Sequence, residues 1–299
     1  MRVSARRTAV GATALATVLL AAVTGCSSGS DDGGSPLLAG LGTLAGDSST
    51  KQVTFLDAAA LRKAGKGDSK RFTSVAQPGS ALLSPYGSRL LGRGFRVTQI
   101  DTAVDTSEAG RWEGSFDASS ITRSLKSEGY TRTERDGAEV WTHPGKTGPS
   151  LQVSEDEIAY STRGSDPMSA VDPKDGSSLA DDKVFRRAAE CLGDVYRADF
   201  NPTSSGKPVS MAALGQRASS ASENTEVLCF VVRDDATAQE LKTELRATVS
   251  DEAPKFDGTK VTVEKGDQPV VRAVVPDTAD QRPGRLIISD MELWMTAAR

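Results

Sequence analysis

The first 25 residues constrain this chain more than any other part, because they decide in which compartment the rest must fold. Three arginines lie within the first seven residues, and about 16 uncharged small and aliphatic residues follow, from Thr8 to Val23. A basic segment followed by a short apolar one is typical of a signal peptide. Crossing a bilayer takes about 20 apolar residues, so a retained membrane-spanning helix is the weaker interpretation. We therefore expect export, and the pair Arg6-Arg7 leaves open whether the general secretory or the twin-arginine route carries it.

The apolar stretch ends in Val-Thr-Gly-Cys at positions 23–26, which resembles the lipobox of bacterial lipoproteins. The resemblance implies that the Cys26 thiol is diacylglycerylated and that cleavage then makes Cys26 the acylated N-terminus. Two long acyl chains, such as palmitate, anchor a protein stably, whereas a single myristoyl chain is only marginal. We therefore expect a protein that is anchored to the cell membrane through the lipid on Cys26, on the extracytoplasmic face.

The residues after this cysteine divide into a linker and a folded body. Ser, Gly and Asp dominate residues 27–36, and this composition buries too little apolar surface to order itself. The following LLAGLGTLA is more apolar and is interrupted by glycines, so it is either a docking segment or more linker. We predict a signal peptide at 1–25, a lipidated cysteine with a flexible tether at 26–50, and two α+β halves at 51–170 and 171–299.

Charge excludes one class of partner. Without the three arginines of residues 1–25, 33 of the 36 basic residues remain against 40 acidic ones, a net charge of −7. Nucleic-acid binding requires clustered Lys and Arg for the phosphates, so we expect no nucleic-acid partner.

Hydrophobic periodicity predicts an α+β fold of antiparallel sheets with helices packed on one face. We expect helices to begin after the N-cap residues Asp57 and Asp117, and another helix at 185–192. The dipeptide Asp136-Gly137 is a strong hairpin signal. The apolar run at 227–232 suits a central strand. We also expect a helix from residue 238 and a solvated charged loop at 66–71. Further strands are expected at 53–56, 95–101, 112–116, 151–153, 158–160, 261–263, 270–275 and 286–295.

The order strand, helix, then antiparallel strands occurs twice along the chain. This repetition predicts two similar halves, related by a structural duplication, with chance similarity of two α+β layers as the alternative. The length and the hydrophobic content suit one large domain or two small ones.

Few residue patterns point to catalysis. His143 is the single histidine, which excludes a multi-histidine zinc site and leaves a Ser-His-Asp triad unsupported. Gly145-Lys146-Thr147 lacks the first glycine of a phosphate-binding loop. Acidic pairs occur at Asp101 and Asp105 and in the clusters 154–157, 181–182 and 234–235, and solvated turns and helix caps account for most of them. We predict no catalytic residue, no metal site and no cofactor.

The remaining two cysteines predict a disulfide. Once Cys26 is acylated, Cys191 and Cys229 are the only thiols left, and the expected compartment is oxidising. The bond would join a helix end to a buried strand. The alternative is a pair of buried free cysteines that serve as small apolar side chains.

Several segments together with the lipobox resemble secreted lipoproteins of actinobacteria, of the Streptomyces type. These segments are IDTAVD, WEGSFD, ITRSL and the later VW, all between residues 94 and 141. The resemblance brings no catalytic residues. We expect a non-enzymatic protein of the cell envelope that binds an unknown envelope protein or ligand, and the alternative is a lipid-anchored hydrolase that acts through carboxylates.

Overall fold

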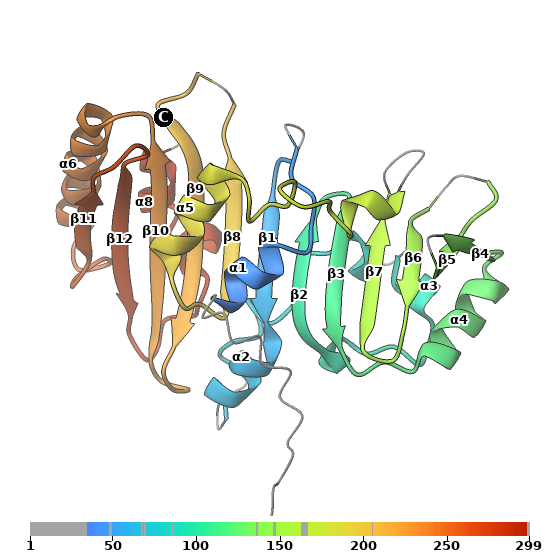
Figure 1. The fold of residues 1–299 in the computed structure, drawn as a ribbon. Coiled ribbons are helices and arrows are strands. Elements are labelled where there is room, and N and C mark those ends of the chain that lie inside the picture. The colour runs from blue at the N-terminus through green and yellow to red at the C-terminus, as the bar shows by residue number, and fades with distance from the viewer. Residues whose placement is uncertain are drawn as a thin grey trace, which may run out of the picture. The chain divides into compact units, whose positions relative to one another are not determined.

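The computed structural model describes residues 35–47, 50–66, 68, 70–84, 87–135, 137–145, 148–162, 167–204 and 206–297. The predicted signal peptide, Cys26 and residues 26–34 of the predicted tether lie outside the described residues. These described residues form one compact unit, and Figure 1 shows that its strands lie side by side in a single sheet.

The sheet has twelve strands, and every neighbouring pair is antiparallel. From one edge to the other they are β11 (Lys260–Glu264), β12 (Val270–Asp277), β10 (Asn224–Val232), β9 (Val209–Ala218), β8 (Arg197–Pro202), β1 (Val53–Asp57), β2 (Ile100–Thr106), β3 (Ala109–Gly114), β7 (Glu157–Ser161), β6 (Ser150–Val153), β5 (Ala138–Thr142) and β4 (Thr131–Arg135).

One strand pair joins the two predicted halves. β1 belongs to the first half and β8 to the second, and they pair from Val53 with Phe200 to Leu56 with Arg197. The hydrogen-bonded ladder therefore runs without interruption across the predicted boundary at residue 170.

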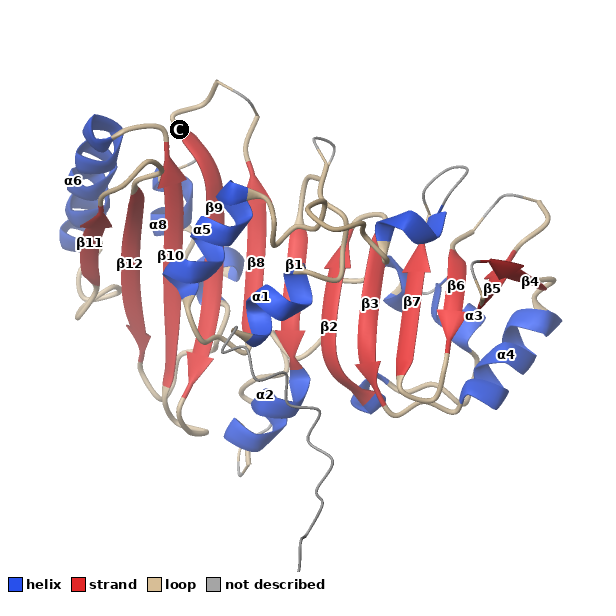
Figure 2. Cartoon of the chain, in the orientation of Figure 1, coloured by secondary structure: helices blue, strands red, loops and turns tan. Residues whose placement is uncertain are grey.

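Helices cover both faces of the sheet rather than the single face that we predicted (Figure 2). Along β10, Cys229 packs in the cluster that contains α5, whereas Phe230 packs in the cluster that contains α6. The physical reason is that β10 is apolar at every position from 227 to 232, so both of its faces need cover. The helices are α1 (Pro36–Leu41), α2 (Ala58–Ala64), α3 (Gly87–Leu91), α4 (Ala118–Ser127), α5 (Lys183–Leu192), α6 (Asp235–Asp251), α7 (Arg285–Ile288) and α8 (Glu292–Thr296), with short 3-10 turns at Ala81–Leu83, Val97–Gln99 and Pro167–Ala170.

The two faces are packed by different helices. The core beneath α1 and α5 contains Leu37, Leu41 and Phe185. On the other face, α2, α3 and α4 cover β1–β7, and α6, α7 and α8 cover β9–β12. The apolar part of the predicted tether therefore docks as α1, and the folded body begins before residue 50.

Two further expectations are wrong, and a third holds only in part. Residues 286–295 form α7 and α8 rather than a strand, because the Glu226 carboxylate accepts hydrogen bonds from backbone N–H groups at the start of α7. The segment 95–101 turns as a 3-10 helix before β2 begins at Ile100. In the predicted solvated loop, Lys66, Asp68 and Lys70 are exposed. Its last residue, Arg71, is instead buried and donates to the carbonyls of Gln281, Ala221 and Thr278.

Candidate functional site

The short helix α2 separates two pockets. Its first turn is fixed by Asp57, whose carboxylate accepts from the Ala60 N–H at 2.7 Å, as the sequence predicted. Ala58 and Leu61 face one pocket, and Ala60 and Ala64 face the other. Because residues one turn apart share a helix face, a seven-residue helix is enough to present one wall to each pocket.

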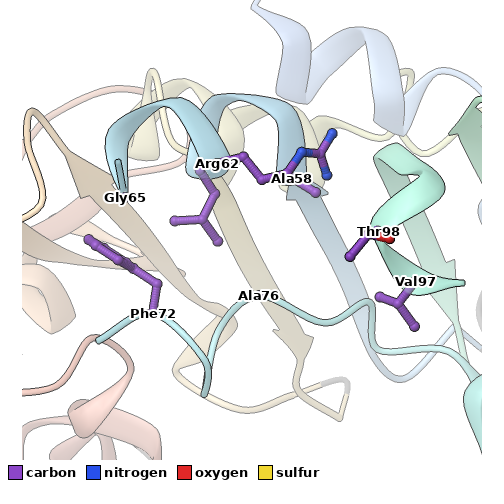
Figure 3. Close-up of a pocket in the computed structure, with 8 residues that line it drawn as sticks. Ala58, Arg62, Gly65, Phe72, Ala76, Val97 and Thr98 are labelled. Atoms are coloured by element: carbon purple, nitrogen blue, oxygen red, sulfur yellow. The ribbon is translucent and has the colours of Figure 1, made fainter. Parts of the chain in front are cut away.

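The first pocket is apolar and has a volume of about 200 Å³. Figure 3 shows it between α2 and the segment that carries Phe72 and Ala76, with Val97 and Thr98 at one end. Arg62 stands at its rim, where its guanidinium donates to the carbonyl of Ile100 and pairs with Asp101. We call this the apolar pocket.

The second pocket has a volume of about 250 Å³ and a mixed lining. It lies among the start of α1, one side of α2 along its length, the loop before β8 and the end of β9. Its polar residues are Ser35, Asp57, Asp194, Tyr196 and Arg217. We call this the polar pocket.

A buried carboxyl lies on the same face of the sheet as α2. Asp105 in β2 accepts hydrogen bonds from Trp112 Nε1 at 2.9 Å and from the Tyr160 hydroxyl at 2.8 Å. The Tyr160 hydroxyl also shares a hydrogen bond of 2.6 Å with the Ser80 hydroxyl. Burial raises the pKa of Asp105 to about 6, against the opposing effect of these hydrogen bonds. Gly110 makes the arrangement possible, because a Cβ there would clash with Asp105 and Tyr160.

A second buried carboxyl belongs to Glu226 in β10. It accepts from Gln216 Nε2 and from the backbone N–H groups of Gly284 and Arg285, each at 2.9 Å. Burial raises the pKa of Glu226 to about 8, and the negative charge of Asp277 acts in the same direction. These contacts tie the C-terminal helices to the sheet.

Asp105 and Glu226 do not form a catalytic pair. Burial also raises the pKa of Asp277, but Arg285 pairs with that carboxylate at 2.8 Å and Asn224 donates to it. Between β2 and β10 lie three strands, so four strand spacings separate Asp105 from Glu226, about 19 Å. Glycosidase carboxyls work roughly 5 to 9.5 Å apart. Asp199 in β8 is nearer to Asp105, but its carboxylate pairs with Arg197 at 2.8 Å. Arg197 also donates to the carbonyl of Gln77, in the loop segment 70–84 that covers this part of the sheet. The hydrolase alternative therefore gains no support from these acids.

The remaining candidate acids are mostly caps and ion-pair partners. Asp182 and Asp234 cap α5 and α6, Asp181 accepts from Ser178, and Glu157 pairs with Arg111. Within the described ranges, no three His, Cys, Asp or Glu side chains gather as a metal-binding group.

His143 follows β5, as expected, and accepts from the Gly145 N–H through Nδ1. Its ring also packs edge-on against Tyr130, with 5.4 Å between the ring centroids. The side chain is therefore occupied by local contacts at the end of the strand.

Cys191 and Cys229 are joined by a disulfide, with 6.1 Å between their α-carbons. The Cys191 carbonyl accepts from Arg272, so the end of α5 is fixed to the sheet by a covalent bond and by a hydrogen bond. Cys26, the predicted lipidation site, lies outside the described residues.

Sequence reasoning did not find either pocket. Ser35, Ala60 and Arg217 are far apart in the chain, and none belongs to a recognisable motif. A weak signal existed for the buried acid: Asp105 follows Ala103 and Val104 in a strand, where a carboxylate is uncommon.

No helix in the described part of the chain is both long and apolar enough to cross a membrane. No family model matches the chain, and neither a curated protein nor a solved structure matches it.

Proposed function

We propose that the chain is an extracytoplasmic lipoprotein, held at the cell membrane by lipid on Cys26, whose folded body binds a small apolar ligand beside α2. The apolar pocket is the observation that supports the binding role. The sequence before Cys26 supports the anchor. The bond between Cys191 and Cys229 agrees with an exported body, because disulfides persist in oxidising compartments.

The walls of the apolar pocket define the ligand. An apolar cavity of about 150 Å³ takes up a benzene-sized molecule, so the 200 Å³ here admits one ring or one branched aliphatic group. The buried Phe72 ring offers an aromatic wall. The Arg62 guanidinium is engaged with Ile100 and Asp101 at the rim, so the interior offers no charge to the ligand.

The binding role is tested with toluene as the probe, by NMR of methyl-labelled mature protein. Toluene should shift the Leu61 methyl signals saturably. Ala76→Leu fills the apolar pocket and should abolish the shift, whereas the matched Ala60→Leu variant, on the other side of α2, should retain it. The proposal is contradicted by no saturable shift, or by equal shifts in both variants.

The anchor has a separate test. Cys26→Ala should leave the precursor uncleaved by the lipoprotein peptidase and unlabelled by a radioactive fatty acid. Equal labelling of wild type and variant would rule out lipid on Cys26. This outcome does not affect the test of the pocket.

An envelope protein is the second candidate partner. Ile288 ends α7, Met291 lies between the two helices and Met295 belongs to α8, and these side chains are 60, 39 and 47% exposed. Methionine-rich apolar surface adapts to varied partners. A photo-crosslinker at position 291 should capture one discrete protein in cells, whereas the same group at Lys242 on α6 should not, and identical patterns would count against this candidate.

We further propose that the two halves arose by duplication. In each, three neighbouring strands are followed by a helix and then by a strand that pairs with the third: β1–β2–β3, α4 and β7, and β8–β9–β10, α6 and β12. The helices α4 and α6 lie on the same face, which fits a two-fold axis between β1 and β8. A crystal structure in which the two sets of strands superpose in order and direction would support this, and strands that fail to coincide in direction would refute it.

A further inference from the structure

The polar pocket contains two buried polar atoms that lack partners. Ser35 Oγ and Arg217 Nε are both fully enclosed, and neither has a hydrogen-bond partner among the residues that the structure describes. Both residues line the same 250 Å³ pocket. Protein interiors rarely leave such groups unpaired, because the lost hydration is not repaid. Two unpaired groups around one pocket therefore indicate a ligand that would satisfy both.

A backbone carbonyl outside the pocket lining holds the guanidinium of Arg217 in place. Its Nη2 donates to the Leu192 carbonyl at the end of α5, which fixes the plane of the group. Burial lowers the pKa of Arg217, and the neighbouring Arg272 acts in the same direction, but arginine stays charged in proteins. A fixed guanidinium N–H beside a hydroxyl is a donor set that suits a carboxylate.

Two acids restrict what that carboxylate can belong to. Asp57 and Asp194 line the same pocket, and the charge of Asp194 acts on Arg217. A simple anion would face both carboxylates and be repelled. A molecule that also carries an ammonium group would instead be attracted by them.

The rest of the lining is aliphatic and the volume is small. Ala64, Val195 and Ala218 complete the walls with Leu37 and Ala60. Ligand pockets commonly hold roughly 300 to 1,000 Å³, so about 250 Å³ limits the ligand to a compact molecule.

We propose that the polar pocket binds a small aliphatic amino acid. When the ligand enters, the Arg217 and Ser35 side chains turn so that Nε and Oγ, which are enclosed in the empty pocket, donate to its carboxylate. Its ammonium group faces Asp57 and Asp194, and its side chain packs among the alanines. This assignment uses no feature of the apolar pocket, so it stands or falls independently of the toluene experiment.

The probes are L-valine and two analogues that each lack one charge, tested by calorimetry on the mature protein. Isobutylamine lacks the carboxylate, and 3-methylbutanoate lacks the ammonium group. L-valine should bind with a dissociation constant below about 1 mM, and each analogue should bind at least about 10-fold more weakly. No heat with L-valine, or equal affinity for 3-methylbutanoate, would overturn the proposal.

Variants identify the site. Arg217→Lys keeps the positive charge but removes the Nε donor, and Ser35→Ala removes only the hydroxyl, so each should weaken L-valine binding several-fold. Ala76→Leu, in the apolar pocket, should bind L-valine like the wild type. Thermal unfolding of each variant shows whether it is folded. Folded Arg217→Lys and Ser35→Ala variants that both bind L-valine with wild-type affinity would overturn the proposal.

Discussion

The β8–β12 side of the sheet is held together differently from the β1–β7 side. On the first, a disulfide ties α5 to β10, and Arg285 bridges Asp277 and Asp290 at 2.8 and 2.9 Å. On the second, no disulfide occurs among the described residues, and aromatic contacts stand beside ion pairs such as Arg111 with Glu157. Phe95 stacks on Trp112, and the Trp112 ring meets Tyr160 edge-on, each pair with 5.7 Å between ring centroids.

Both pockets therefore lie beside α2, between the β8–β12 side, which the disulfide cross-links, and the β1–β7 side, which has no such cross-link. The segment at 70–84 covers the β1–β7 side, but Arg71 and Ser74 fasten it to carbonyls near the C-terminus. α2 lies beside this segment, and no disulfide fixes either of them to the sheet. We therefore expect local opening to begin around α2 and α4, while α5 and β10 stay closed until global unfolding.

The largest expected effect comes from removing the disulfide. For a sequence separation of 38 residues, the chain-entropy model gives a loss of about 4 kcal/mol in the free energy of unfolding for Cys191→Ala with Cys229→Ala. Urea unfolding of the oxidised wild type and of the double variant measures it. A loss below about 1 kcal/mol would mean that the disulfide does not account for the difference in stability between the two sides.

Sequence patterns predicted the local structure well where nearby residues decide the conformation. The Asp57 and Asp117 caps, the hairpin of β4 and β5 and the strand β10 all lie where expected. Such features depend on neighbours within a few residues, and periodicity records those neighbours directly.

The same reasoning failed where distant groups decide the conformation. Residues 286–295 alternate enough to suggest a strand, but the carboxylate of Glu226, about 60 positions earlier, fixes a helix start at Gly284. The solvated-loop prediction failed at Arg71 alone, because this side chain finds carbonyl acceptors more than 100 residues away. The pockets escaped prediction for the same reason, since no local pattern brings Ser35 next to Arg217.

A smaller effect is expected from Asp105 on the aromatic side. Its carboxyl has an ordinary pKa of 3.8 and a folded value of about 6. As the pH rises through this window, the unfolded chain loses the proton first, so this group lowers stability, by about 3 kcal/mol once the pH exceeds 6. Asp105→Asn should remove that cost.

Unfolding in urea at pH 4, 5, 6 and 7 measures the effect. The stability of Asp105→Asn relative to wild type should rise between pH 4 and pH 6 and then stay level. Comparing the two proteins cancels the contributions of the other titrating groups. A difference that does not change with pH would show that the buried carboxyl is ionised in the folded state throughout.

The smallest effect comes from two matched helix caps, one on each side of the sheet. Asp117 accepts from the Ser120 N–H at 2.9 Å at the start of α4, and Asp234 accepts from the Thr237 N–H at 2.8 Å at the start of α6. Asp117→Ala and Asp234→Ala should each lower Tm by roughly 2 to 4 °C, because the β1–β8 ladder makes the sheet unfold as one unit.

Hydrogen exchange then separates the two sides. Asp117→Ala should speed exchange in α4 well below the unfolding transition, because α4 packs on the side without the disulfide. Asp234→Ala should leave exchange in α5 and β10 unchanged, because the Cys191–Cys229 bond holds them independently of α6. Equal acceleration on both sides would mean that the disulfide and the ionic contacts give no local protection, and two separate thermal transitions would mean that the β1–β8 ladder does not couple the halves.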